Sequence, residues 1–150
     1  MDIIQFLDEN SILIDFKSKS KKNILESISH EMSNGNIADK DLIFEKLYER
    51  EKLGTTAFGN GIAIPHARIP ELKKPKIVII KLKEPINFEA IDEEDVDVII
   101  SLIVPDEEND LHVKVLAKIA ELLEKKEFRL KIRAATNTKA ILSIIKDFKE

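Results

Sequence analysis

Two nearly uninterrupted runs of Val, Ile and Leu constrain the fold more than any other feature of the chain. The first extends from Lys76 to Leu82, and the second from Val96 to Val104, where only Asp97 and Ser101 interrupt it. A strand with one face in water alternates apolar and polar residues, whereas a strand covered on both faces is apolar throughout. The two runs therefore predict strands that are buried between two layers.

Amphipathic segments around these runs predict the covering helices. Their apolar residues recur at helical spacing, and capping residues mark several of the ends. The expected helices run from a cap at Ser20 to a stop at Asn34-Gly35, from Asp39 to just before Gly54, from about Asp110 to Lys125, from about Glu127 to Ala134, and from caps at Thr136 to Thr138 through Ile141, Ile144, Ile145 and Phe148. Helices interleaved with buried strands predict an α/β fold, with a mixed β-sheet flanked by helices on both faces.

Composition narrows the class of protein. The chain has 150 residues, 43% of them apolar, and no Pro/Gly/Ser-rich linker divides it, so we expect a single domain over residues 1–150. It has no cysteine, which excludes disulfides, a Cys-type zinc site and a thiol nucleophile. With 24 basic and 28 acidic residues, the chain lacks the excess of positive charge that is typical of nucleic-acid-binding proteins.

Neither a membrane segment nor a signal peptide is visible in the sequence. The longest aliphatic run, Ile77 to Ile80, is far too short to span a bilayer, and the first residues lack a basic start and an apolar stretch. We therefore expect a cytoplasmic protein with no direct membrane insertion.

Three histidines are candidates for chemistry, since the common nucleotide, hydrolase and metal motifs are absent. His30 lies near the polar C-terminal end of a predicted helix and is interpreted as a surface residue. His66 follows Pro65, whose fixed φ makes the backbone there rigid, and the preceding Gly59 and Gly61 allow backbone amides to approach an anion. On these features alone, an ordinary structural role for His66 remains the favoured interpretation.

His112 and Arg50 have conventional explanations when each is taken alone. His112 lies in the first turn of a predicted helix, where a capping or core-edge role is favoured. It could equally offer an N–H to a phosphate in front of that helix. Arg50 ends another predicted helix and is by default a surface charge.

A longer pattern changes the interpretation of Arg50, His66 and His112. Residues 50–68, REKLGTTAFGNGIAIPHAR, resemble the active-site signature of the type-2 (fructose/mannitol/nitrogen-related) IIA components of the bacterial phosphoenolpyruvate:sugar phosphotransferase system. Further landmarks are residues 85–92, PINFEAID, the strand ending at Val104-Pro105, and residues 111–117, LHVKVLA, so that the resemblance covers essentially the whole chain.

The resemblance implies a phosphocarrier that acts through a covalent phosphohistidine. His66 would accept a phosphoryl group from phospho-HPr, the small donor protein, and pass it to a IIB component during sugar uptake. Arg50 and His112 would assist at the phosphate site, and Gly59 and Gly61 would offer backbone amides. Transfer between two imidazoles needs positioning and charge stabilisation, so no cofactor and no metal are expected.

Two alternatives remain open at this stage. In the nitrogen-related branch, the phosphorylation state controls protein partners without sugar transport. A third possibility is a degenerate module that only binds other proteins, although the intact histidine, arginine and glycine-rich turn argue against it. For docking of the partner proteins, the sequence suggests Phe58 and Ile69, because neither lies in a periodic apolar stripe. Ordinary packing under the loop is an equally open alternative for both residues.

Overall fold

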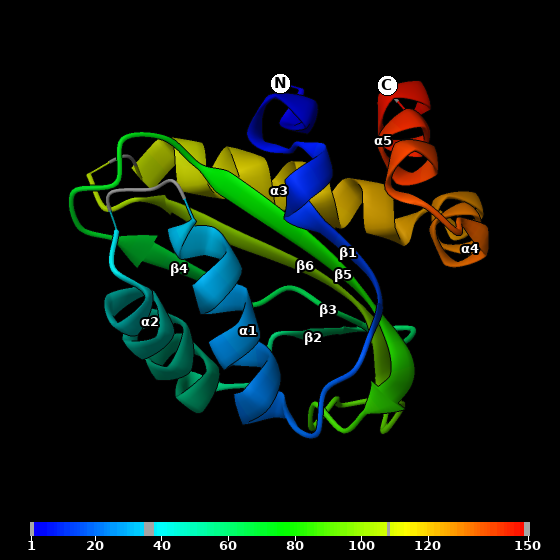
Figure 1. Cartoon of the computed structure of the whole chain (residues 1–150), viewed down its shortest axis with the longest axis horizontal. Helices are drawn as coiled ribbons and strands as arrows, with labels where there is room; N and C mark the ends of the chain where they lie inside the picture. The colour runs from blue at the N-terminus through cyan, green and yellow to red at the C-terminus, as the bar shows by residue number, and fades with distance from the viewer. Residues whose placement is uncertain (1, 35–37, 108, 149–150) are drawn as a thin grey trace.

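The structure, a computed structural model, describes residues 2–34, 38–107 and 109–148. Within these residues one mixed sheet lies between two helical layers, as the sequence predicts (Figure 1). The strands are β1 (Ile12–Phe16), β2 (Ala57–Gly59), β3 (Ile62–Ala63), β4 (His66–Ile69), β5 (Lys76–Ile86) and β6 (Val96–Pro105). The helices are α1 (Lys21–Ser33), α2 (Lys40–Leu53), α3 (Asn109–Glu124), α4 (Lys126–Ala134) and α5 (Thr138–Asp147), with short 3₁₀ helices at Ile3–Phe6 and Glu9–Ser11.

Strand β6 is the strand around which the sheet is organised. One edge of β6 pairs antiparallel with β5, which in turn pairs parallel with β1. Its other edge pairs parallel with β3 and then with β4, so that Ile62 lies opposite Val98 and His66 lies opposite Leu102. β3 and β4 therefore follow one another along the same edge of β6.

Proline interrupts the chain between β3 and β4. Pro65 has no N–H to contribute to a ladder, but its carbonyl accepts hydrogen bonds from the Leu102 N–H at 3.0 Å and from the Ser101 hydroxyl at 2.7 Å. Ser101 is fully buried, which explains the one hydroxyl at the centre of an apolar strand. These two hydrogen bonds hold Pro65 against β6. They thereby fix the register at which β4 begins with His66, opposite Leu102.

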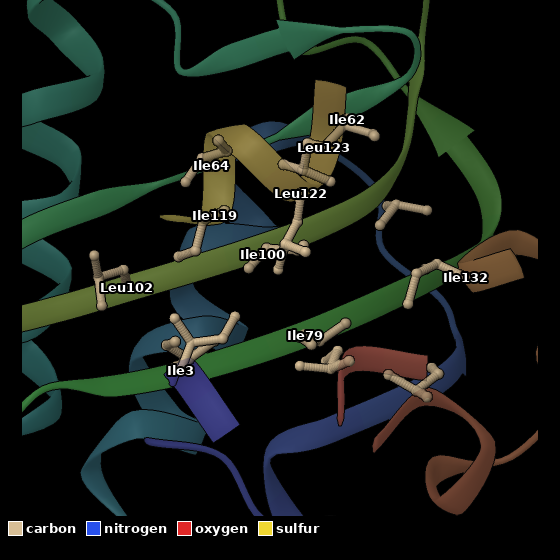
Figure 2. Close-up of a cluster of buried hydrophobic side chains, with 14 of the residues drawn as sticks. Ile3, Ile62, Ile64, Ile79, Ile100, Leu102, Ile119, Leu122, Leu123 and Ile132 are labelled. Carbon is tan, nitrogen blue, oxygen red and sulfur yellow. The ribbon is translucent and has the colours of Figure 1, made fainter. Parts of the chain in front are cut away.

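Each face of the sheet has its own apolar core. Helices α1 and α2 cover one face, while α3, α4 and α5 cover the other (Figure 1). On the second face, Ile100 and Leu102 of β6 and Ile62 of β3 point toward Ile119 and Leu122 of α3 (Figure 2). Successive residues of β5 and β6 alternate between the two cores, so both runs have to be apolar throughout.

The predicted helix ends agree with the structure to within about two residues. Ser20 caps α1 by accepting a hydrogen bond from the Asn23 N–H at 3.1 Å, and Asp39 and Gly54 flank α2. The cap of α5 is Asn137, inside the predicted capping segment. Gly35, half of the predicted stop after α1, lies outside the described residues.

The elements that the sequence did not predict are mainly short strands. β1 has five residues, and its register shifts between Leu13 and Phe16, where Asp15 adopts a φ of 54°. The stretch expected to be a turn and a short apolar segment forms β2, β3 and β4, each of four residues or fewer. Strands this short show too little periodicity to be recognised from the sequence.

Truncation of a core leucine tests the assignment of α3 to the second core. Leu123 is fully buried, whereas Leu130 of α4 is 57% exposed. Leu123→Ala should lower the free energy of unfolding by about 2–5 kcal/mol because it leaves a cavity. Urea unfolding measures this, with Leu130→Ala as the matched control. Equal losses in both variants would contradict the assignment.

Candidate phosphoryl-transfer site

His66 is placed at the start of β4 by the pairing of that strand with β6. Ala67 and Ile69 are buried in the core under α1 and α2. Side chains alternate along a strand, so His66 and Arg68 face the opposite way, toward the N-terminal end of α3. The imidazoles of His66 and His112 lie there with ring centroids 5.5 Å apart.

A backbone hydrogen bond sets the tautomer of His66. Its Nδ1 lies 2.7 Å from the carbonyl oxygen of Ile64. A carbonyl can only accept, so Nδ1 carries the proton in the neutral ring. Nε2 is therefore left with a lone pair, as a nucleophilic nitrogen requires.

The surroundings of His66 keep its imidazole neutral. Burial, the largest effect, lowers the pKa of His66 below its ordinary value of 6.5, and the nearby positive charge of Arg50 lowers it further. The hydrogen bond to Ile64 and the negative charge of Glu51 raise this pKa but do not cancel the decrease. The neutral, nucleophilic form of His66 is thus favoured at neutral pH.

His112 begins the buried stripe of α3 and is also held neutral. Burial, followed by the proximity of His66 and Arg68, lowers the pKa of His112 to about 4. Its Nδ1 is buried and forms no hydrogen bond with any described residue. An unpaired buried donor is costly, so we assign the lone pair to Nδ1 and the proton to Nε2. His112 then has an Nε2–H available to donate.

Arg50 comes to the site from the last turn of α2. Its Nη1 donates a hydrogen bond to the Gly54 carbonyl at 2.8 Å, so the guanidinium folds over the end of its own helix. Arg50 and His66 line the same pocket, and the charge of Arg50 contributes to the lowered pKa of the imidazole. The structure thus brings together Arg50, His66 and His112, which the sequence separates by up to 62 positions.

A surface pocket of about 630 Å³ surrounds these three residues. Four of its side chains are basic and one is acidic, so it suits an anion. Residues from α2, β4 and α3 form its wall: Lys46, Glu49, Arg50, Lys52, Leu53, His66, Ala67, Arg68 and His112. Lys46, which the sequence analysis missed, is one helical turn from Arg50, and that i, i+4 spacing was the available signal.

Gly59 and Gly61 lie at the other end of the small strands. Together with Asn60 they form the β2–β3 turn, where all three residues have positive φ values. A Cβ on Gly61 would lie 2.7 Å from the guanidinium of Arg133, which pairs with Asp97 at 2.8 Å. Ile62 and His66 pair with positions four residues apart on β6, roughly 13 Å at the usual rise of a strand. The structure does not bring these glycines to the pocket.

The residues suggested for docking are also placed differently. Ile69 is fully buried in the core under α1 and α2, so the suggestion that it contacts partner proteins is wrong. Phe58 is half-buried and packs against the other core. Leu53 of α2, 85% exposed, instead lines the pocket, and Val113 of α3, 61% exposed, follows the lining residue His112 in sequence. Leu53 follows Lys52, and Val113 lies between His112 and Lys114. Neither position stands out from the other residues of its predicted helix, so the sequence did not indicate an exposed apolar side chain there.

Comparisons with known proteins agree with this geometry. The family described as "Phosphoenolpyruvate-dependent sugar phosphotransferase system, EIIA 2" matches residues 5–148. The chain belongs to this family. The resemblance inferred from residues 50–68 is thereby confirmed.

Several EIIA 2 relatives match over nearly their whole length. The chain is 37% identical over 145 residues to a nitrogen regulatory protein of Bradyrhizobium diazoefficiens, covering 97% of this chain and 95% of that protein. It is 36% identical to the one from Pseudomonas aeruginosa, covering 95% and 94%. The crystal structure of nitrogen regulatory protein IIA-Ntr from Neisseria meningitidis superposes with a TM-score of 0.91 and 31% identity, covering 95% of this chain and 98% of that chain.

Two further features of this EIIA 2 chain concern membranes and metals. Among the described residues, every helix is too short or too polar to cross a bilayer. Within the same residues, no three His, Asp or Glu side chains gather in a way that could hold a metal ion.

The depressed pKa of His112 makes stability depend on pH. The unfolded chain binds a proton at His112 with a pKa near 6.5, whereas the folded protein does so only at about 4. Between these values the unfolded state binds more protons, so the free energy of unfolding should fall as pH drops from 6.5 to 4. His112→Asn should flatten the dependence of the unfolding free energy on pH, measured by urea titration. His30→Asn, at an exposed position of α1, is the control. An unchanged slope in His112→Asn would refute the assignment.

Proposed function

We propose that this protein accepts a phosphoryl group on Nε2 of His66 and passes it to another protein. The observation that carries the proposal is the Nδ1–Ile64 hydrogen bond, which leaves Nε2 as the nucleophile inside a basic pocket. In the first step, Nε2 attacks the phosphorus of a donor phosphohistidine. A new N–P bond forms, the donor N–P bond breaks, and its electron pair stays on the donor imidazole. The second step repeats this with His66 as the donor.

Arg50 and His112 stabilise the charge of the transferring group from opposite sides. The phosphoryl group brings about −1.5 to −2 charge at pH 7. Arg50 supplies a guanidinium from α2, and His112 supplies a neutral donor at the N-terminal end of α3, where the helix dipole also favours an anion. Neither residue needs to carry the phosphoryl group itself.

The donor in this proposal is phospho-HPr, and the exchange takes place in the cytoplasm. For the destination, a IIB component during sugar uptake was the first expectation from the sequence. The relatives from Bradyrhizobium diazoefficiens and Pseudomonas aeruginosa, at 37% and 36% identity, are named nitrogen regulatory proteins, and both match over nearly their full length. This favours the second candidate, in which the phosphorylation state of His66 controls binding to other proteins without sugar transport.

Phosphotransfer from phosphoenolpyruvate through enzyme I and HPr tests the central step. Mass spectrometry should show one acid-labile phosphoryl group on the wild-type protein and none on His66→Ala, because that variant lacks the nucleophilic nitrogen. His30→Ala, outside the pocket, is the control and should be phosphorylated normally. One phosphoryl group on His66→Ala would overturn the assignment.

Leu53 and Val113 offer the apolar contact that a transient transfer complex needs. Both are exposed; Leu53 lines the pocket from α2, and Val113 is next to the lining residue His112 in α3. Transfer complexes bury little area, often below about 1,200 Å², so single apolar anchors contribute much of the affinity. We therefore place the donor protein over these two side chains.

Substitution of Leu53 tests this docking surface. Leu53→Ser should raise the KM for phospho-HPr several-fold, while kcat and the thermal midpoint stay close to those of the wild type, since an 85% exposed side chain adds little to the core. Ile91→Ser is the matched control because Ile91 is 93% exposed and lies in the loop before β6, outside the pocket wall. Equal KM values for both variants would place the docking surface elsewhere.

A further inference from the structure

Glu51, next to Arg50 in sequence, is the one charged residue that is buried among the described residues. Only 4% of its side chain is exposed, and its Oε2 lies 2.8 Å from the Nζ of Lys21 at the start of α1. Buried ion pairs gain little net stability, because desolvation opposes the Coulomb attraction. The position of this pair, directly behind the candidate site, suggests a different role.

The carboxylate of Glu51 holds the loop that leads from α2 into the small strands. Oε2 accepts a hydrogen bond from the Thr56 N–H at 2.8 Å, and Oε1 accepts one from the Thr56 hydroxyl at 2.5 Å. With Lys21 included, the carboxylate has three partners. Such a fully bonded buried carboxylate fixes the groups around it.

From Thr56 the hydrogen bonds continue to the candidate nucleophile. The carbonyl of Thr56 accepts a hydrogen bond from the Ile64 N–H at 2.9 Å. The carbonyl of Ile64 then accepts the Nδ1–H of His66 at 2.7 Å. Glu51 is therefore linked, through Thr56 and Ile64, to the bond that orients the imidazole.

The same loop also holds Arg50. The Gly54 carbonyl that accepts the hydrogen bond from Arg50 lies two residues before Thr56, and the Gly54 N–H itself bonds to the Glu51 carbonyl at 3.2 Å. The Glu51 carboxylate thus fixes Thr56, whose carbonyl holds the backbone that orients His66. The main-chain carbonyl of Glu51 bonds to Gly54, the residue that receives the guanidinium two positions before Thr56.

We infer that Glu51 is a positioning residue that sets the orientation of both His66 and Arg50 for phosphoryl transfer. The inference rests on the proposed function. Lys21 completes the arrangement, because its ammonium compensates a negative charge that would otherwise oppose an arriving phosphoryl group. Glu51 does not touch the phosphoryl group; it acts through Thr56, Ile64 and Arg50.

The test compares Glu51→Gln with Glu89→Gln. Both glutamates pair with Lys21, but Glu89 is 3.4 Å away and its side chain is 75% exposed, so it provides a matched control. We expect Glu51→Gln to lower kcat for phosphoryl transfer by about 10- to 100-fold, as misplacement of reacting groups does, with little change in KM. Glu89→Gln should leave both parameters unchanged.

Nitrogen NMR of the unphosphorylated protein gives a second readout that a purely structural role would not affect. Wild-type His66 should be observed as the Nδ1–H tautomer. In Glu51→Gln, the tautomer population should become mixed. The pKa of His66 should also fall further, because the negative charge of Glu51 raises it in the wild-type protein.

A second pair of variants covers the case in which Glu51→Gln does not fold. Thr56→Val removes the hydroxyl that bonds to Oε1 while keeping the backbone N–H, and Thr56→Ser restores the hydroxyl. We expect kcat to fall in Thr56→Val and to recover in Thr56→Ser.

The outcomes separate this inference from the proposed function. If the wild-type protein takes no phosphoryl group, the proposed function fails, while the NMR result still decides whether Glu51 orients His66. If folded Glu51→Gln, or Thr56→Val in its place, keeps the wild-type tautomer, His66 pKa and kcat, Glu51 is not a positioning residue.

Discussion

The pairing along one edge of β6 is the constraint on which the sheet and the site both depend. β3 and β4 occupy that edge in turn, and Pro65 separates them. The Leu102 N–H and the Ser101 hydroxyl donate hydrogen bonds to the Pro65 carbonyl, and these bonds fix the register of β3 and β4 against β6. A shift of one residue would turn His66 away from the pocket and toward the apolar core. The position of the candidate nucleophile, His66, therefore depends on strand register.

Electrostatics divides the site into two zones. The open pocket is basic and suits an incoming anion, whereas the buried zone behind it contains the carboxylate of Glu51, neutralised by Lys21. Burial keeps both imidazoles uncharged, so that neither the nucleophile nor its neighbouring donor has to lose a proton before reaction. In the proposed reaction, positive charge thus comes from arginine and lysine, and nucleophilicity comes from histidine.

The elements that the sequence predicts well are those that bury long apolar stripes. β5 and β6 follow from their nearly unbroken apolar runs, and helices α1 to α5 follow from periodicity and capping, because each contributes side chains to a core. β1 and the three short strands do not, since their pairing depends on partners remote in sequence. For the site, His66 was indicated by the residue 50–68 pattern rather than by its own surroundings. The glycines show the limit of local reasoning: their positive φ values serve a turn packed against Arg133, which the sequence places 72 residues away from Gly61.

Arg50 and His112 reach His66 from opposite helical layers, α2 on one side of the sheet and α3 on the other. A partly folded chain with only one layer docked would still contain an imidazole on β4, but half of its charge stabilisation would be missing. Bringing segments that are distant in sequence together carries a cost of loop closure, so these contacts depend on the tertiary structure that holds both layers in place. Under the proposed function, a chain would gain reactivity only once both helical layers are in place, and a signal read from phosphorylated His66 would exclude incompletely folded molecules.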